Sequence, residues 1–286
     1  MTQRPALSLF ALPVLALLLA SACSAQNDPV PAQTTAPVAT AEVAPAGTDA
    51  ATANAASDTT AQATSADPAA TAAAQAMAAS AASAAENGPA LVAGTDYAEI
   101  PGGQPFDPLN GKIEVVEVFG YTCPHCATFQ QLVNAWKPTL ATDVRFTYMA
   151  APFGGYWEPY AKAFYTAQAM GVLEASHDAV FDAVHLQRSL PVQPLPSDQQ
   201  LAAFYAKYGA DPKVFVSTLS SFAINAKLGR ARQFIERSFA GEVASTPTLI
   251  INGKYRVTGK TQEEHLRIAN QLIARERAAQ EPATQQ

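Results

Sequence analysis

Residues 113–126 read Ile-Glu-Val-Val-Glu-Val-Phe-Gly-Tyr-Thr-Cys-Pro-His-Cys, an apolar run that ends in a C-x-x-C motif. Most of the residues before Gly120 are β-branched or aromatic, which predicts a β-strand, and the glycine ends it. From Cys126 to Trp136 the apolar residues recur at helical spacing. Cys123 is therefore expected at a helix N-terminus, where unpaired N–H groups and the positive end of the helix dipole stabilise a thiolate.

The sequence on both sides of this stretch predicts the other strands of a β-sheet. A short strand is expected at 97–100, and alternating apolar residues predict another at 144–148. The C-x-x-C strand, its helix and the strand at 144–148 form a βαβ unit, which implies parallel neighbours. Two later strands, at 248–251 and 254–257, are joined by the two-residue turn Asn252-Gly253.

Helices account for the rest of the predicted elements. Thr261 and Glu264 form a capping box for a final helix with an apolar face. Between 152 and 240 the sequence predicts helices only, at 157–170, 176–188, 198–208, 212–220 and 222–240. This segment is interpreted as a helical insertion in an α/β fold.

Two motifs of this sequence resemble the DsbA-like thiol:disulfide oxidoreductases of the thioredoxin superfamily. The first is Phe-Gly-Tyr-Thr-Cys-Pro-His-Cys at 119–126, and the second is Thr246-Pro247-Thr248, which leads into the predicted hairpin. The resemblance covers about residues 96–280. It extends to the order of the elements, because the family also carries a helical insertion between its two motifs.

The resemblance implies the fold class α/β, a thioredoxin fold with an inserted all-helical domain. The thioredoxin-like domain is expected to combine residues 96–151 with residues 241–281, and the insertion domain to span residues 152–240. The resemblance further implies a protein disulfide oxidoreductase that needs no cofactor and works through Cys123 and Cys126.

The cysteine pair carries the predicted chemistry. Disulfide exchange needs an exposed thiol of low pKa and a second thiol that resolves the mixed disulfide. Cys123 would be the sulfur that is attacked, and Cys126, one turn into the helix, would be more buried. Pro124 and His125 complete the catalytic motif, and His125 can donate a hydrogen bond to the Cys123 thiolate. Because such contacts stabilise the reduced enzyme, the disulfide form is expected to be an oxidant.

An inert structural disulfide and half of a metal site are two other interpretations of the C-x-x-C motif. A structural zinc site usually has four ligands. The sequence holds neither a second cysteine pair nor a nearby His-x-x-x-His motif, so no metal site is expected.

Three further site residues come from the resemblance. It implies a cis Pro247 across from Cys123, with Thr246 offering backbone hydrogen bonds to an extended substrate; a plain turn proline is the alternative. It also implies that Glu117 is buried beneath the active site as a proton acceptor, whereas an edge-facing glutamate, like Glu114, is the alternative. The family's partnering lysine is not found, because Asp143 occupies its region of the sequence.

The first 95 residues predict export and a tether. Residues 1–22 carry an apolar run behind Arg4, as a secretory signal peptide does. Cys23 follows Ala20-Ser21-Ala22, which resembles the lipobox of bacterial lipoproteins, where the cysteine is lipidated; ordinary cleavage at the same A-x-A site is the alternative. Residues 23–95 are rich in Ala, Thr and Pro and lack aromatic residues, so a disordered tether is expected.

The acidic charge of the chain belongs to the predicted tether. Segment 24–95 holds six acidic residues and no Lys or Arg, and the whole chain has a net charge of −6. The predicted folded part is therefore nearly neutral and offers no basic surface for nucleic acid. His177, His185 and His265 show no ligand spacing and are expected to be solvated or structural.

The motifs and the export signal together predict a periplasmic oxidase, anchored to a membrane if Cys23 is lipidated. Its partners would be reduced or unfolded exported proteins and, by the resemblance, a quinone-linked membrane oxidase of the DsbB type. A disulfide reductase or isomerase is one alternative, and a lipid-tethered, non-catalytic chaperone or metal-binding module is another. Isomerases of the superfamily use an N-terminal dimerisation domain, which segment 24–95 lacks the strands to build, so a monomer is expected.

Overall fold

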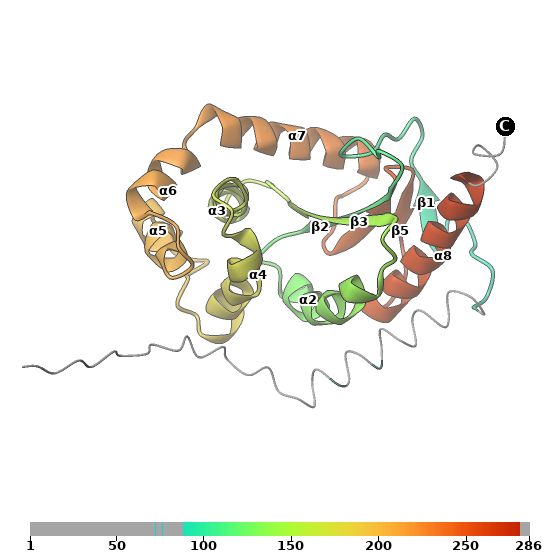
Figure 1. Ribbon diagram of the computed structural model, residues 1–286, viewed down its shortest axis with the longest axis horizontal. Coiled ribbons are helices and arrows are strands. Elements are labelled where there is room, and N and C mark those ends of the chain that lie inside the picture. Colours follow the sequence, from blue (N-terminus) through green and yellow to red (C-terminus); the bar gives the residue numbers. More distant parts are fainter. Residues whose placement is uncertain (1–71, 73–75, 77–87, 281–286) are drawn as a thin grey trace, which may run out of the picture. The chain divides into compact units, whose positions relative to one another are not determined.

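β2 (Ile113–Phe119), the strand that leads to the C-x-x-C motif, lies inside a five-stranded sheet of order β1-β5-β4-β2-β3 in the computed structural model (Figure 1). It pairs in parallel with β3 (Val144–Ala150) and antiparallel with β4 (Thr248–Ile251). β5 (Tyr255–Val257) pairs antiparallel with both β4 and β1 (Tyr97–Glu99). The predicted strands and the parallel βαβ unit are confirmed.

The structure describes residues 72, 76 and 88–280, which belong to the unit of residues 62–286. The predicted signal peptide, Cys23 and nearly all of the predicted tether lie outside the described residues. Among the described residues, no helix combines the length and the apolar character that crossing a membrane requires.

Helices cover both faces of the sheet, and every residue of β2 is buried as a result. On one face, Val115 packs in a cluster with α2 (Pro124–Trp136) and α8 (Gln262–Gln280), which lie side by side in Figure 1. On the other face, Val118 packs with the helices that lie between β3 and β4 in the sequence. A strand that is buried on both faces needs apolar side chains on both, so its sequence is a nearly continuous run of apolar residues.

The five helices predicted between β3 and β4 are present. They are α3 (Trp157–Ala169), α4 (Leu173–Phe181), α5 (Asp198–Ala206), α6 (Pro212–Leu219) and α7 (Phe222–Phe239). Ser197 and Gln200 form the predicted capping box of α5, and the Asp211 carboxylate caps α6. The expected α/β fold, a thioredoxin fold with inserted helices, is confirmed.

The second of these helices differs in extent from its prediction at 176–188. It begins earlier, because Gly171, with a φ of 72°, lets the chain turn directly after α3. The α-helix then ends at Phe181 and continues as a π-helix over Asp182–Leu186. A π-turn bonds residues five apart, a period that the apolar spacing of the sequence does not reveal.

The turn between β4 and β5 is one residue longer than predicted. Ile251 pairs with Tyr255, and the Lys254 N–H donates to the Ile251 carbonyl over 2.8 Å, so Lys254 belongs to the turn. Asn252 and Gly253 have φ values of 50° and 65°, as the tight turn predicted for this dipeptide requires. The error is therefore in the strand boundary and not in the turn residues.

Glu114 does not face solvent at the sheet edge but is fully buried. Its carboxylate accepts the N–H groups of Phe106 at 2.6 Å and Asp107 at 2.9 Å, and it pairs with Arg145 at 2.7 Å. These charge-assisted contacts offset the cost of burying a carboxylate. The partners lie in the preceding loop and in β3, so only the folded chain brings them together.

Candidate active site

Cys123 occupies the N-cap position of α2, and Pro124 is the first residue of that helix. The Cys123 N–H donates to the Gly120 carbonyl at 3.0 Å, and its Sγ accepts the Cys126 N–H at 3.4 Å. Pro124 fits because the first helical N–H has no helical partner. The cysteine sulfur thus accepts the hydrogen bond that a capping oxygen accepts in other helices.

The two cysteines differ in exposure. Cys123 is 7% exposed and Cys126 is fully buried, and both are free thiols. Pro124 and His125, which lie between them, are exposed. Cys123 is therefore the sulfur that another molecule can reach.

The surroundings also separate the pKa values of the two thiols. Hydrogen bonding by the Cys126 thiol is the largest effect on Cys123, and the backbone N–H groups of Cys126 and His125 add to it, which lowers the pKa of Cys123 to about 5. Burial raises the pKa of Cys126, and the neighbouring Cys123 raises it further. At neutral pH the site holds a Cys123 thiolate beside a Cys126 thiol, the pair that disulfide exchange requires.

The loop before β4 lies against Cys123. The Thr246–Pro247 peptide bond is cis, as the resemblance implies, and Pro247 is buried. The Thr246 carbonyl lies 3.5 Å from Cys123 Sγ, which donates to it as a thiol. Because β4 pairs with β2, two segments 123 residues apart in the sequence meet at this sulfur.

Glu117 lies in the middle of β2, beneath the active site, and is 1% exposed. Among the described residues, neither of its carboxyl oxygens has a hydrogen-bond partner. Burial raises the pKa of Glu117 to about 8, and the Cys123 thiolate acts in the same direction. The side chain is therefore not an edge-facing glutamate, and it carries a proton at neutral pH.

Lys137 is the cation that acts on Glu117, and the sequence did not identify it. Its charge lowers the pKa of Glu117, against the effect of burial. It directly follows α2, where helical spacing alone does not place it near β2. One feature of the sequence could have identified this residue, because Lys137 is the first lysine or arginine after Cys126. Asp143, which directly precedes β3, pairs instead with Arg277 at 2.6 Å.

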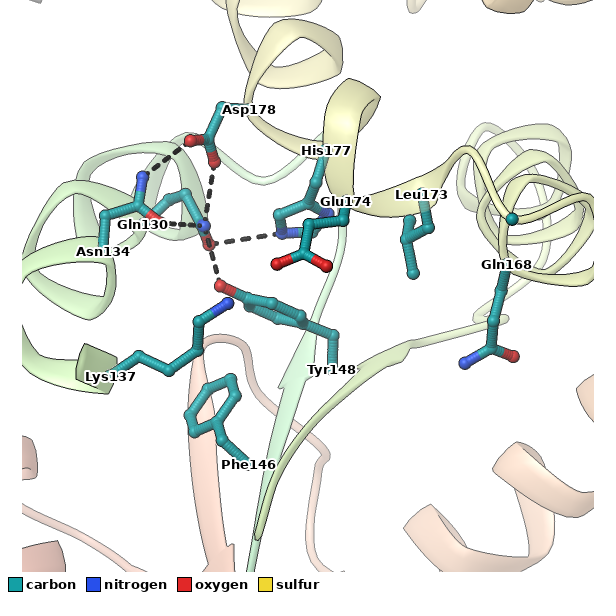
Figure 2. Close-up of a pocket in the computed structure, with 11 residues that line it drawn as sticks. Gln130, Asn134, Lys137, Phe146, Tyr148, Gln168, Leu173, Glu174, His177 and Asp178 are labelled. Carbon is teal, nitrogen blue, oxygen red and sulfur yellow. Dashed lines mark hydrogen bonds between the residues drawn. The ribbon is translucent and has the colours of Figure 1, made fainter. Parts of the chain in front are cut away.

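A pocket of about 520 Å³ lies between α2, β3 and α4, and Figure 2 shows Lys137 and Tyr148 in its wall. Tyr148 is the residue of β3 that pairs with Glu117, and the two groups interact electrostatically. Gln130 connects the walls, because its Nε2 donates to the Tyr148 hydroxyl at 2.9 Å and to Asp178 at 3.0 Å. The pocket therefore opens beside the neighbours of Glu117, and neither cysteine lines it.

Two histidines of the helical segment hold Tyr121, two residues before Cys123. His177 Nδ1 lies 2.7 Å from the Tyr121 hydroxyl, and His185 Nε2 lies 2.7 Å from the Tyr121 carbonyl. Burial lowers the pKa of His177 to about 3, so its ring is neutral. His265 bonds the Gly259 carbonyl at 2.8 Å. All three histidines have structural contacts, and two of them fix the approach to the active site.

Within the part of the chain that the structure describes, no group of three or more His, Cys, Asp or Glu residues could hold a metal ion. The site instead combines a reachable thiolate, a buried thiol and a cis-proline loop on a thioredoxin-type sheet. These features define the class of thiol:disulfide oxidoreductases.

Known proteins of this class are similar in sequence and structure. Residues 109–270 match the family model described as Thioredoxin. The chain is 38% identical over 195 residues to the thiol:disulfide interchange protein DsbA of Pseudomonas aeruginosa, over 66% of this chain and 87% of that protein. The crystal structure of oxidoreductase DsbA from Xylella fastidiosa has a TM-score of 0.63 and 47% identity, over 66% of this chain and 98% of that one. For the Pseudomonas aeruginosa DsbA structure the TM-score is 0.60 and the identity 37%, over 67% and 97%.

The chain therefore belongs to the DsbA family of the thioredoxin superfamily. It is a protein thiol:disulfide oxidoreductase.

Proposed function

We propose that this protein introduces disulfide bonds into exported proteins in the periplasm, through Cys123 and Cys126. The contrast between the two sulfurs carries the proposal: the pKa of the reachable Cys123 is lowered to about 5, and that of the buried Cys126 is raised. A stable thiolate favours the reduced enzyme, so the oxidised enzyme tends to pass its disulfide to another protein.

The reaction starts from a disulfide between Cys123 and Cys126. A substrate thiolate attacks Cys123 Sγ and forms a mixed disulfide, while the bond to Cys126 breaks and the Cys126 thiolate takes up a proton. A second substrate thiolate attacks the substrate sulfur of the mixed disulfide, and Cys123 leaves as a thiolate. The substrate gains a disulfide, and two electrons pass to the enzyme.

Thr246 and Pro247 are proposed to bind the substrate next to the reacting sulfur. The Thr246 carbonyl is 3.5 Å from Cys123 Sγ, so a peptide whose sulfur reaches Cys123 passes this loop. An extended substrate can pair its backbone with such a loop, as an added strand does. This contact would bind the backbone of the substrate and would not depend on which side chains the substrate carries.

Glu117 is proposed to exchange a proton with Cys126. A carboxyl group with a pKa of about 8 holds a proton at neutral pH, which it can give to the leaving Cys126 thiolate and accept again on reoxidation. The two groups interact electrostatically. Water in the pocket of Figure 2 would connect this proton to solvent past Lys137 and Tyr148.

Oxidation of a reduced two-cysteine peptide tests the function directly. The oxidised protein should oxidise the peptide, and Cys123→Ser should abolish the reaction. Cys126→Ser, treated with glutathione disulfide, should accumulate a mixed disulfide between Cys123 and glutathione, because the thiol that resolves it is missing. The reduction potential should lie well above the roughly −270 mV of thioredoxin. A potential near that value would favour the reductase alternative, and a wild-type protein that oxidises no peptide would favour a non-catalytic chaperone.

The periplasm is the proposed location because the first 22 residues have the form of a secretory signal peptide. A quinone-linked membrane oxidase of the DsbB type is the proposed acceptor of the electrons. Lipidation of Cys23 is proposed from the Ala20-Ser21-Ala22 sequence before it. The intact mass of membrane-extracted protein should include a lipid on Cys23, and a mass without lipid would contradict the anchor.

A further inference from the structure

Gln262, the first residue of α8, contacts the active-site turn from the far end of the sequence. Its Nε2 donates to the His125 carbonyl at 2.8 Å and to Thr128 Oγ1 at 3.2 Å. The Thr128 hydroxyl in turn donates to the same His125 carbonyl at 3.0 Å. Side chains from two neighbouring helices (Figure 1) therefore converge on one backbone oxygen of the C-x-x-C motif.

That oxygen belongs to the peptide group that joins His125 to Cys126. The N–H of the same peptide group donates to Cys123 Sγ at 3.4 Å. Resonance couples the two ends of a peptide group, so a carbonyl that accepts hydrogen bonds makes the attached N–H a stronger donor. A continuous series of hydrogen bonds thus runs from Gln262 to the sulfur of Cys123.

We propose that Gln262 is a positioning residue of this oxidoreductase: by donating to the His125 carbonyl, it strengthens the hydrogen bond from the Cys126 N–H to the Cys123 thiolate. This role rests on the proposed function and deepens it. A hydrogen bond to a charged sulfur is stronger than one to a neutral sulfur. Gln262 therefore favours the reduced enzyme over the disulfide form and makes that form a stronger oxidant.

A structural role for Gln262 would have a different signature. If its side chain only joined α8 to α2, its loss would lower the stability of the reduced and oxidised proteins alike. The ionisation of Cys123 would then stay the same. The charge on the sulfur exists in the reduced protein alone, so the proposed role predicts an effect on that state.

The test is a pH titration of the Cys123 thiolate by its ultraviolet absorbance, in full-length reduced protein carrying Gln262→Met. Methionine keeps the length of the side chain and removes the donor. Linked hydrogen bonds strengthen one another modestly, so losing the Gln262 donor should weaken the bond from the Cys126 N–H to the Cys123 thiolate. The pKa of Cys123 should then rise by on the order of 0.3, a roughly twofold change in the thiol-to-thiolate ratio. The equilibrium constant for oxidising glutathione should fall about twofold, since both report the same thiolate.

Gln271→Met is the matched control on the same helix, because Gln271 Nε2 donates to the Pro89 carbonyl at 3.1 Å, away from the cysteines. It should leave both readouts at the wild-type values. Thr128→Val removes the second donor to the His125 carbonyl and should raise the pKa of Cys123 in the same direction, whereas Thr128→Ser should not. This pair keeps the inference testable if Gln262→Met fails to fold.

Two results would overturn the inference, and they differ in what else they reject. A low wild-type pKa of Cys123 that Gln262→Met and Thr128→Val leave unchanged would reject the role of Gln262 alone. A wild-type Cys123 that titrates as an ordinary thiol, in a protein that oxidises no peptide, would reject the proposed function as well.

Discussion

Glu117 is a single side chain that should set part of the pH dependence of stability. Burial raises its pKa from 4.5 to about 8 in the folded protein. Folding therefore favours the protonated carboxyl, so its contribution is fully present below about pH 4.5 and is lost as the pH rises to about 8. Each unit of pKa corresponds to about 1.4 kcal/mol, which makes the loss several kcal/mol.

Glu117→Gln should remove this loss. Urea unfolding of the oxidised protein, in which neither thiol titrates, should give nearly equal free energies of unfolding for variant and wild type at pH 4.5. At pH 9 the variant should be more stable by several kcal/mol, because glutamine stays neutral. If the free energies of unfolding of the two proteins changed with pH in the same way, Glu117 would not titrate in this range.

Lys137 should hold the pKa of Glu117 below the value that burial alone would give. In Lys137→Met, the pKa of the Glu117 carboxyl should rise by roughly one unit, the scale expected for losing a nearby opposite charge. Infrared or carbon NMR titration of the carboxyl group measures this shift. Lys213→Met, on α6, should leave the titration unchanged, and an equal effect of both variants would exclude a specific role for Lys137.

At the scale of the element, Gly120 decides how closely β2 approaches α3. A Cβ at this position would overlap the indole ring of Trp157. Phe153 and Tyr156 pack on this ring, with ring centroids 5.1 and 5.9 Å away. The absence of a side chain is therefore a packing requirement next to the active-site turn.

Gly120→Ala should lower the free energy of unfolding by about 1–3 kcal/mol, the usual cost of overpacking. Gly229→Ala is the matched control, because a Cβ there, on α7, meets no atom within 4 Å. It should stabilise the protein by roughly 0.5–1 kcal/mol, since alanine favours a helix interior over glycine. Urea unfolding measures both changes, and a Gly120→Ala variant as stable as wild type would show that the indole yields freely.

Elements with a local signal were predicted from the sequence, and those that depend on distant contacts were not. The capping box of α5 lies within four residues, so Ser197 and Gln200 were sufficient to predict it from the sequence. The π-helix over Asp182–Leu186 has no such signal. It brings His185 to the Tyr121 carbonyl, a contact with a loop that lies 64 residues away in the sequence.

For the whole molecule, the lowered pKa of Cys123 links stability to redox state. The folded pKa, about 5, lies below the ordinary thiol value of 9.0. Ionisation of Cys123 therefore stabilises the reduced fold fully above about pH 9, and the stabilisation is lost as the pH falls through 5. The disulfide form has no such dependence, because its sulfurs do not ionise.

The free energy of unfolding of the reduced protein, relative to that of the oxidised protein, should therefore fall when the pH is lowered from 8 to 4.5. Urea unfolding in both redox states measures it. Cys123→Ser should show less of this pH dependence than the reduced wild type, because serine does not ionise. A relative stability that is constant between these pH values would contradict a Cys123 thiolate at neutral pH.

The sequence alone determined the features that depend on neighbouring residues. The apolar run of β2, the change to helical spacing after Cys126 and the Asn252-Gly253 turn each follow from local backbone and packing preferences. They led to the sheet, to the helical segment and to Cys123 at a helix start. The resemblance of two short motifs added the DsbA family, and with it a cis Pro247.

Only the tertiary structure decided the electrostatic surroundings of the active-site helix. The resemblance had named Glu117, but its raised pKa depends on burial and on its distance from Lys137, and the contact of Gln262 depends on packing between segments far apart in the chain. A pKa and a hydrogen bond are set by three-dimensional surroundings, which no local pattern encodes. Sequence thus identified the sulfurs, and folding fixed their protonation at neutral pH.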